Sequence, residues 1–350
     1  MKNPLNFYKY LPYVLRRKFN NKYIVIESDD WGMMGSRSKE AIDYLGKKYG
    51  KENFSRWTTD AIETTSDLEL LYDLLYKYKD SFKSPPVITT NFITHNIDYT
   101  DDSELNFQPL SEYLSHNMEL RDLYDKGIVN NYIYPQLHGY SHYNFDTLNK
   151  YFNNENSKNL FDLGFLTGDS TIKTIPNSFK GELIQQNKNV ERNLRLAVNE
   201  FSNLFGFKPR TIIPPHFILD LNLLNIIKAH GIQCIQACNR LIRFNRTRIR
   251  KVFFRKQNGL YWFPRNARLD PHNHYNYFAE QCLESIEKAF QSHIPAIIDF
   301  HRVNISGKYN SSYRDRTLKE LNFVLQTVEK QWPDTQFIST DELLRKICQT

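Results

Sequence analysis

Short apolar segments recur along the chain, and each is followed by a polar loop or by a helical pattern. The segments have the length of strands and lie at residues 23–26, 87–93, 132–134, 211–213, 232–235, 260–263, 296–300 and 336–338. Strands that alternate with helices favour a parallel sheet, because a parallel neighbour needs a crossover connection. Seven or eight such units in one chain favour closure over an open sheet. We therefore expect an α/β fold, an incomplete or distorted (β/α)7–8 barrel.

Helix signals fall between these strands. Ser66–Glu69 is a capping box, which predicts a helix that continues to about Lys79. Further helices are expected at Val190–Leu204 and Leu221–His230, each stopped by a glycine, and Ser339–Glu342 caps a last one. No repeat, low-complexity tract or long linker interrupts the pattern. We expect a single domain over residues 1–350, with residues 1–20 as a basic and aromatic N-terminal extension.

Composition narrows the class of protein. Hydrophobic residues make up 40% and charged residues 24%, which is typical of a soluble globular protein. The formal net charge is +7, and much of it lies in Arg16–Lys18 and Arg240–Lys256. A basic run of this kind can contact nucleic acid or an anionic surface, but no nucleic-acid-binding motif accompanies it. We interpret it as a solvated face around a short strand and expect no nucleic-acid partner.

The four cysteines and the apolar content bear on the compartment. Cys234, Cys238, Cys282 and Cys348 are too few for a disulfide framework. No apolar run reaches the length of a signal peptide or a transmembrane segment. We expect a cytoplasmic protein without a transmembrane segment, whose basic and aromatic N-terminus can still make peripheral contact with a membrane.

Candidate site residues follow the predicted strands. Active sites of (β/α) barrels lie at the carboxyl ends of the strands, so polar residues at these positions are catalytic candidates. They are Asp29, Asp30, Asn91, His138, His142, His216 and His301.

Two of these positions carry adjacent carboxylates, and two carry a pair of imidazoles. Asp29 and Asp30 repel one another unless a cation or a donor satisfies them, although an Asp pair alone more often caps a helix. His138 and His142 are four apart, which on one helical turn places both rings on the same face, as one metal ion requires. Among ten histidines such a pair can also arise by chance. Two His and one Asp make a three-ligand site with open positions.

The order of these motifs resembles the polysaccharide deacetylase (NodB-homology, carbohydrate esterase) family, in a divergent branch. The resemblance covers residues 23–301: a strand ending in Asp29-Asp30, the strand at residues 89–94, the HxxxH pair, a strand ending in Pro214-Pro215, and a late strand ending in His301. It implies a metal-dependent hydrolase that removes N- or O-acyl groups, acetyl above all, from a carbohydrate or polysaccharide.

The resemblance also implies roles for individual residues. Asp29 is the general base, and Asp30, His138 and His142 bind one divalent ion, for which we expect zinc, with cobalt or nickel as alternatives. His301 is the general acid, and the backbone N–H of His216 donates to the oxyanion. We expect the substrate-binding residues to be Asn91, Trp262 and Asp299.

Two positions depart from the family pattern. The family has Arg directly before Pro-Pro, where it orients the catalytic Asp, and this chain has Ile213. Arg210, Arg265 and Arg302 are the candidates to replace it from another strand. The family also has Leu two residues before the final His, and this chain has Asp299. Asp299 shares a strand face with His301 and would favour its protonated, acid form.

Other functions remain open at this point. The same site would serve a metal-dependent amidohydrolase acting on a smaller metabolite. The substitutions at positions 213 and 299 would also fit a catalytically inactive barrel that binds glycan. Metal content and acetate release distinguish these alternatives.

Overall fold

The computed structural model describes residues 17–36, 38–51, 54, 56–98, 106–142, 190–215, 219, 221–238, 241–242, 248–249, 253–271 and 277–349. Its main feature is a sheet in which all neighbouring strands run parallel except one short strand at the edge. The strands of this sheet are β1 (Tyr23–Trp31), β2 (Ile88–Ile93), β5 (Ile133–Gly139), β6 (Thr211–Ile212), β7 (Cys234–Cys238), β10 (Lys256–Gln257), β11 (Leu260–Arg265), β12 (Ala267–Arg268), β13 (Ala296–His301) and β14 (Gln336–Phe337).

The order of the strands shows that the sheet curves back on itself. The order is β10-β11-β7-β6-β5-β2-β1-β13-β12, and β14 pairs with the start of β1. Only Asn266 separates β11 from β12, although they pair with opposite sides of the series. Its side chain accepts from Ile297 N and donates to Pro295 O, both at 2.8 Å. The expected incomplete (β/α) barrel is confirmed, with seven strand positions when β11 and β12 count as one.

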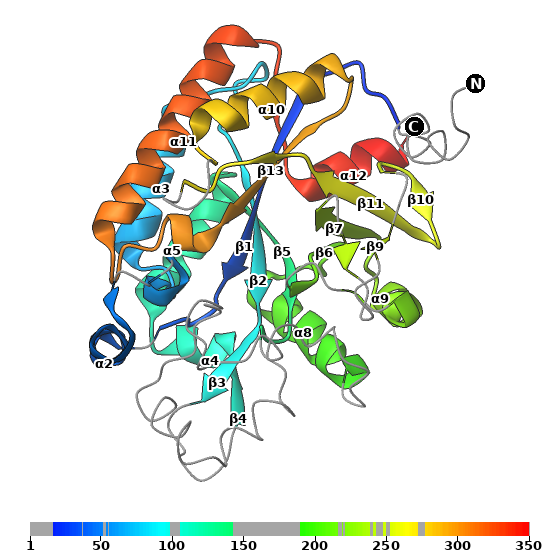
Figure 1. The fold of residues 1–350 in the computed structure, drawn as a ribbon. Helices are drawn as coiled ribbons and strands as arrows, with labels where there is room; N and C mark the ends of the chain where they lie inside the picture. The colour runs from blue at the N-terminus through cyan, green and yellow to red at the C-terminus, as the bar shows by residue number, and fades with distance from the viewer. Residues whose placement is uncertain are drawn as a thin grey trace, which may run out of the picture.

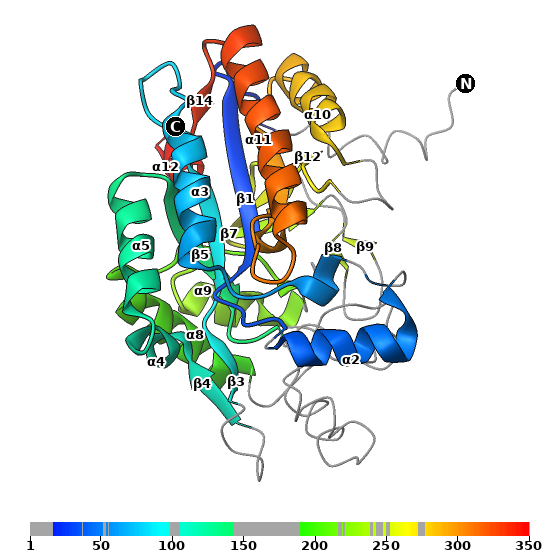
Figure 2. The same cartoon turned by 90° about the vertical axis from the view of Figure 1, so that its left-hand side faces the viewer.

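Helices and 3-10 turns lie around the sheet, some on its outer face and others at its two ends (Figure 1, Figure 2). They are α2 (Lys39–Tyr49), α3 (Thr65–Tyr76), α4 (Leu110–Ser115), α5 (Met118–Val129), α8 (Val190–Phe205), α9 (Leu224–Ala229), α10 (Ala279–Gln291), α11 (Ser311–Gln331) and α12 (Thr340–Cys348), with 3-10 turns η2 (Arg56–Thr59), η6 (Leu221–Leu223) and η7 (Arg302–Asn304). Figure 1 shows α3, α5, α10 and α11 on one side and α8 and α9 on the other. Figure 2 shows the hairpin of β3 (His95–Asp98) and β4 (Asn106–Pro109) beyond the carboxyl end of β1. A second hairpin joins β8 (Leu241–Ile242) and β9 (Arg248–Ile249).

The side chains of β1 alternate between two environments. Ile24 and Ile26 pack with the helices outside the sheet. Val25 packs inside the barrel with residues of other strands and of α12, which closes the end where the strands begin. Glu27 and Asp29 continue this inward face, because successive side chains of a strand point to opposite sides. The interior of the barrel is therefore polar toward the carboxyl ends of the strands.

Most predicted elements are present, but one helix begins earlier than predicted. Thr64, not Ser66, is the N-cap of α3. The Thr64 hydroxyl accepts from Asp67 N at 3.3 Å, and the Asp67 carboxylate accepts from Thr64 N at 2.9 Å. The prediction of Ser66 was wrong because Asp67 completes a capping box with the earlier hydroxyl.

Candidate metal and acid–base site

An irregularity in β1 brings the two adjacent carboxylates to one end of the barrel. The pairing of β1 with β2 shifts register between Ser28 and Trp31. Asp30 lies in this shift with φ of 69°, in the left-handed region that non-glycine residues seldom occupy. In a regular strand Asp29 and Asp30 would face opposite sides of the sheet. The irregularity lets both carboxylates lie at the barrel mouth, each with its own partners.

Asp30 meets the two predicted histidines. The Nε2 atoms of His138 and His142 lie 3.2 Å and 3.3 Å from the same oxygen, Asp30 Oδ1. All three side chains are buried, and their candidate ligand atoms lie within 4.8 Å of one another. The helical turn expected over the HxxxH pair is absent, because His138 belongs to β5 and His142 follows it. Gly139, with φ of 135°, provides the bend that turns His142 back toward Asp30.

The donors of this cluster suit a divalent metal such as zinc. His138 Nδ1 lies 2.9 Å from the carbonyl oxygen of Ile213, which only accepts, so Nδ1 carries the proton. This hydrogen bond leaves Nε2 facing Asp30, and metal-bound imidazoles usually donate their other ring N–H to a carbonyl or carboxylate oxygen in the same way. Burial disfavours the charged form of Asp30, but the His142 charge and the His138 hydrogen bond hold the pKa of this carboxyl well below its ordinary value. The cluster thus offers two nitrogens and one ionised oxygen.

Asp29 is held by an arginine from another strand. Arg265, the last residue of β11, donates from Nη2 to Asp29 Oδ1 at 2.5 Å and from Nη1 to Oδ2 at 2.7 Å. Among Arg210, Arg265 and Arg302, Arg265 is therefore the one whose guanidinium binds Asp29. Burial opposes ionisation of Asp29, but the charges of Arg265 and His138 outweigh it and lower the pKa of this carboxyl. Asp29 is ready to accept a proton once a reaction supplies one.

Arg265 also binds two further carboxylates. Its Nε donates to Glu27 at 2.8 Å, and its Nη1 donates to Asp299 at 2.6 Å. Asp29, Asp299 and His301 form a second group close enough to hold a metal ion. The Arg265 guanidinium already supplies positive charge to both carboxylates of that group. Asp30, His138 and His142 are therefore the more suitable of the two groups for a metal ion.

His301 lies beside Asp29, at the end of β13. Its Nε2 atom is 4.0 Å from Asp29 Oδ2, and its Nδ1 atom is 3.6 Å from Asp270 Oδ2 and 3.9 Å from Asp299 Oδ1. The pairing of β1 with β13 sets this contact, because Asp29 and His301 are partners in its register. Trp57 packs against the imidazole with ring centroids 5.1 Å apart.

Two predicted substrate contacts are corrected. Trp262 is fully buried in the core beneath α8 and α9, and its indole N–H donates to Gln257 O at 3.2 Å, so it does not reach the site. The residue faces outward because the strand alternates, and Arg265 takes the inward face. Asn91 is also fully buried and donates to Asp29 Oδ1 at 2.9 Å and to Gln236 Oε1 at 2.8 Å. Asn91 therefore holds Asp29 in place from inside the barrel and is not exposed to a substrate.

The other predicted positions have different standings. Asp299 lies at the site but is engaged by Arg265, and its side chain is 10% exposed. His216 lies outside the described residues. Sequence reasoning missed Glu27, Trp57 and Asp270. Glu27 could have been found as an acid two residues before Asp29 on an apolar strand, and Asp270 as an acid just past a strand end.

Buried carboxyl and guanidinium groups crowd the described part of the barrel mouth. Seven buried carboxylates meet four guanidinium groups there. The carboxylates are Glu27, Asp29, Asp30, Asp60, Glu63, Asp270 and Asp299, and the guanidinium groups belong to Arg56, Arg265, Arg268 and Arg302. Burial raises the pKa of Glu27, Asp60 and Glu63, so the group carries less negative charge than the number of its carboxyls suggests.

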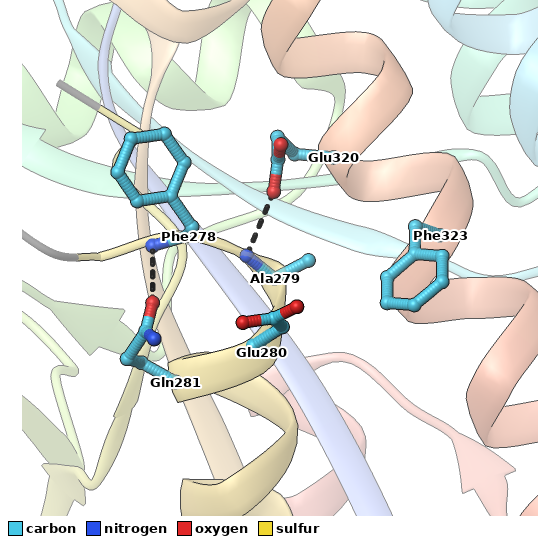
Figure 3. Close-up of a pocket in the computed structure, with 6 residues that line it drawn as sticks. All are labelled: Phe278, Ala279, Glu280, Gln281, Glu320 and Phe323. Atoms are coloured by element: carbon cyan, nitrogen blue, oxygen red, sulfur yellow. Dashed lines mark hydrogen bonds between the residues drawn. The ribbon is translucent and has the colours of Figure 1, made fainter.

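Two hollows lie away from Asp30, His138 and His142. One, of about 350 Å3, lies between α10 and α11, and Figure 3 shows its lining. The Glu320 carboxylate accepts from Ala279 N there at 2.8 Å, so the start of α10 already has its anion. The other, of about 510 Å3, lies near the starts of α3 and α5 and includes Glu63 and Lys308 in its lining. Neither contains a residue of the Asp30 cluster.

Comparisons with known proteins connect the chain to carbohydrate-active folds. A model of glycosyl hydrolase family 57 matches residues 176–335, which is less than half of the chain. No curated protein matches the sequence. The 4-alpha-glucanotransferase from Thermococcus litoralis has a similar structure, with a TM-score of 0.50 and 10% identity over 93% of this chain and 40% of that one. The chain thus spans less than half the length of that enzyme, and the likeness supports the fold alone.

Two further solved structures are more distant. The peptidoglycan deacetylase PdaC from Bacillus subtilis has a TM-score of 0.42 and 10% identity over 94% of this chain and 93% of that one. A family 4 acetyl xylan esterase from Clostridium thermocellum, in complex with a cobalt ion, has a TM-score of 0.40 and 10% identity over 93% of this chain and 91% of that one. Within the described residues, no helix is both long enough and apolar enough to cross a membrane.

Proposed function

We propose that the protein is a metal-dependent hydrolase that removes acetyl groups, bound as amide or ester, from a carbohydrate. The observation that carries the proposal is the meeting of Asp30, His138 and His142 beside Asp29, which Arg265 holds as a carboxylate. This arrangement joins a three-ligand site to a separate ionised acid, and hydrolysis of an acyl group needs both. The proximity of Asp30, His138 and His142, which the sequence motifs led us to expect, supports the proposal.

Each residue has a distinct task in this proposal. A divalent ion at Asp30, His138 and His142 would supply Lewis-acid polarisation of the acyl carbonyl and of a water molecule. Asp29 accepts the proton of the attacking water, since the two hydrogen bonds from Arg265 fix its carboxylate in place. His301, within 4.0 Å of Asp29, donates a proton to the departing sugar nitrogen or oxygen. The His216 amide is proposed as the oxyanion donor on the family resemblance alone.

Metal analysis and acetate release test the proposal together. Purified protein is analysed for zinc, cobalt and nickel, and acetate is measured after incubation with N- and O-acetylated oligosaccharides. One bound ion per chain and acetate release that stops on chelation are the expected results. Metal without turnover on any acetylated glycan would favour the inactive glycan-binding barrel, and turnover only on small amides would favour an amidohydrolase.

Cleavage of glycosidic bonds is the second candidate, because a model of glycosyl hydrolase family 57 matches residues 176–335. A glycosidase needs one carboxylic acid that can protonate the leaving oxygen. Asp29 and Asp270 both accept hydrogen bonds from guanidinium groups, which keeps them ionised and unsuited to that task. Release of reducing sugar from α-glucans, measured beside acetate release, separates the two functions.

A further inference from the structure

Trp57 is the aromatic residue that lies against the proposed acid. It belongs to η2, and its ring meets that of His301 nearly at a right angle, with 85° between the planes and 5.1 Å between the centroids. The indole is half-buried. The Arg56 guanidinium carbon lies over the same indole at 4.4 Å.

Two buried ion pairs fix η2 relative to β13. Arg56, one residue before Trp57, pairs with Asp270, and Asp270 Oδ2 is also 3.6 Å from His301 Nδ1. On the other side, Asp60 pairs with Arg302 at 2.7 Å, and Arg302 directly follows His301. Buried ion pairs seldom add much net stability, but they fix a geometry. The indole and the imidazole are therefore held as one unit, with little freedom to move apart.

The position of His301 identifies the part of a substrate that would meet Trp57. A general acid must lie within hydrogen-bonding reach of the atom that it protonates, and here that atom is the sugar nitrogen or oxygen that leaves. The sugar ring attached to this atom then lies beside the ring that touches His301. A pyranose presents an apolar face of C–H groups, and a preorganised indole suits such a face.

We propose that Trp57 is the platform on which the sugar ring carrying the acyl group packs, and that it selects sugars over acyclic leaving groups. The proposal rests on the proposed deacetylase function. It concerns the leaving group and makes no claim about the acyl group. A residue that contacted the acyl group would instead change the preferred length of the acyl chain.

The test compares two esters that share the acetyl group. One is an O-acetylated methyl pyranoside, and the other is 2-methoxyethyl acetate, which has no ring. Trp57→Ala is expected to lower kcat/KM on the pyranoside about tenfold or more while changing kcat/KM on the acyclic ester less than about twofold. Trp57→Phe should keep most of the activity, since it keeps an aromatic face. Metal content and melting temperature should match those of the wild type.

Tyr76→Ala is the matched control, because this aromatic residue is 65% exposed at the end of α3 and lies outside the site. Tyr76→Ala should leave kcat/KM unchanged on both esters. An equal loss on both esters after Trp57→Ala, or a change that follows acyl length, would overturn the proposal.

A second measurement keeps the inference apart from the deacetylase proposal. Calorimetric titration with a tetramer of N-acetylglucosamine measures binding whether or not the protein turns it over. If no acetylated compound is hydrolysed, the proposed function fails, while binding that Trp57→Ala abolishes still supports the platform. Binding that is absent, or unchanged by Trp57→Ala, contradicts it.

Discussion

Asp29 and Asp30 are neighbours in sequence but have different partners. Arg265 holds Asp29, whereas His138 and His142 surround Asp30. Asp29→Asn should leave metal affinity nearly intact and lower kcat about a hundredfold or more, because it removes only the base. Asp30→Ala should lower metal occupancy, and added metal should restore part of the activity. Metal analysis and initial rates check both, and two variants alike in metal content and rate would show that the roles are wrongly assigned.

Arg265 is the counter-ion of three buried carboxylates, Glu27, Asp29 and Asp299. Arg265→Met would remove the counter-ion that these carboxylates share, with only Arg268 left 3.6 Å from Asp299, and should lower the free energy of unfolding by about 3–5 kcal/mol near neutral pH. The loss should shrink in mild acid, because the freed carboxyls then take up protons instead of staying charged. Urea unfolding at pH 5 and pH 8 measures this difference. A loss that is equal at both pH values would contradict the account.

His95 ties stability to pH at a single residue. It is buried, stacks on Tyr140 with ring centroids 4.0 Å apart, and burial lowers its pKa from 6.5 to about 4. The unfolded chain therefore binds a proton that the folded chain does not bind between these values. The stabilisation is complete above pH 6.5 and is lost as pH falls toward 4, by up to about 3 kcal/mol. His95→Phe keeps the stacking and should weaken this part of the pH dependence in urea unfolding, whereas an unchanged slope would exclude His95 as its source.

At the scale of elements, a residue of one helix caps another. Glu320 of α11 accepts from Ala279 N at the start of α10, as Figure 3 shows. Glu320→Gln keeps the shape but removes the charge from the helix start, and Glu320→Ala removes the acceptor as well. We expect losses of unfolding free energy of a few tenths and of about 1 kcal/mol, respectively. Thermal unfolding checks the order of stability of the two variants. Equal stability of the wild type, Glu320→Gln and Glu320→Ala would show that Glu320 does not stabilise the start of α10.

Element prediction succeeded where local signals agree with the fold. The strand after residue 295 and the helix that begins at Val190 follow from apolar periodicity and glycine stops, and both are present. The bulge at Asp30 and the bend at Gly139 could not be predicted, because they depend on how β1 and β5 pair with their neighbours. These two irregularities bring the ligand side chains together. The sequence could therefore indicate that Asp30, His138 and His142 lie together, but it could not give their geometry, and it placed Trp262 wrongly.

At the scale of the whole molecule, the barrel explains how Arg265 reaches Asp29 from a strand that is distant in sequence. Strand ends that are distant in sequence face the same interior, so Arg265 from β11 reaches a carboxylate on β1. From the sequence, Arg265 was one of three candidates, because the sequence does not show which strand ends face one another in the barrel. Trp262, three residues earlier, was assigned to the site although it faces the outer core. Barrel closure decides both cases.

The pairing of β1 with β13 has a consequence for biosynthesis. Ile24 pairs with Ala296, so one edge of β1 stays without its neighbour until β13 has been made. At ribosomal rates of about 5–20 residues per second, this delay lasts on the order of ten to fifty seconds. During that time an apolar strand edge is open to pairing with other nascent chains. The yield of the protein in a cell should therefore depend on chaperones that cover this edge.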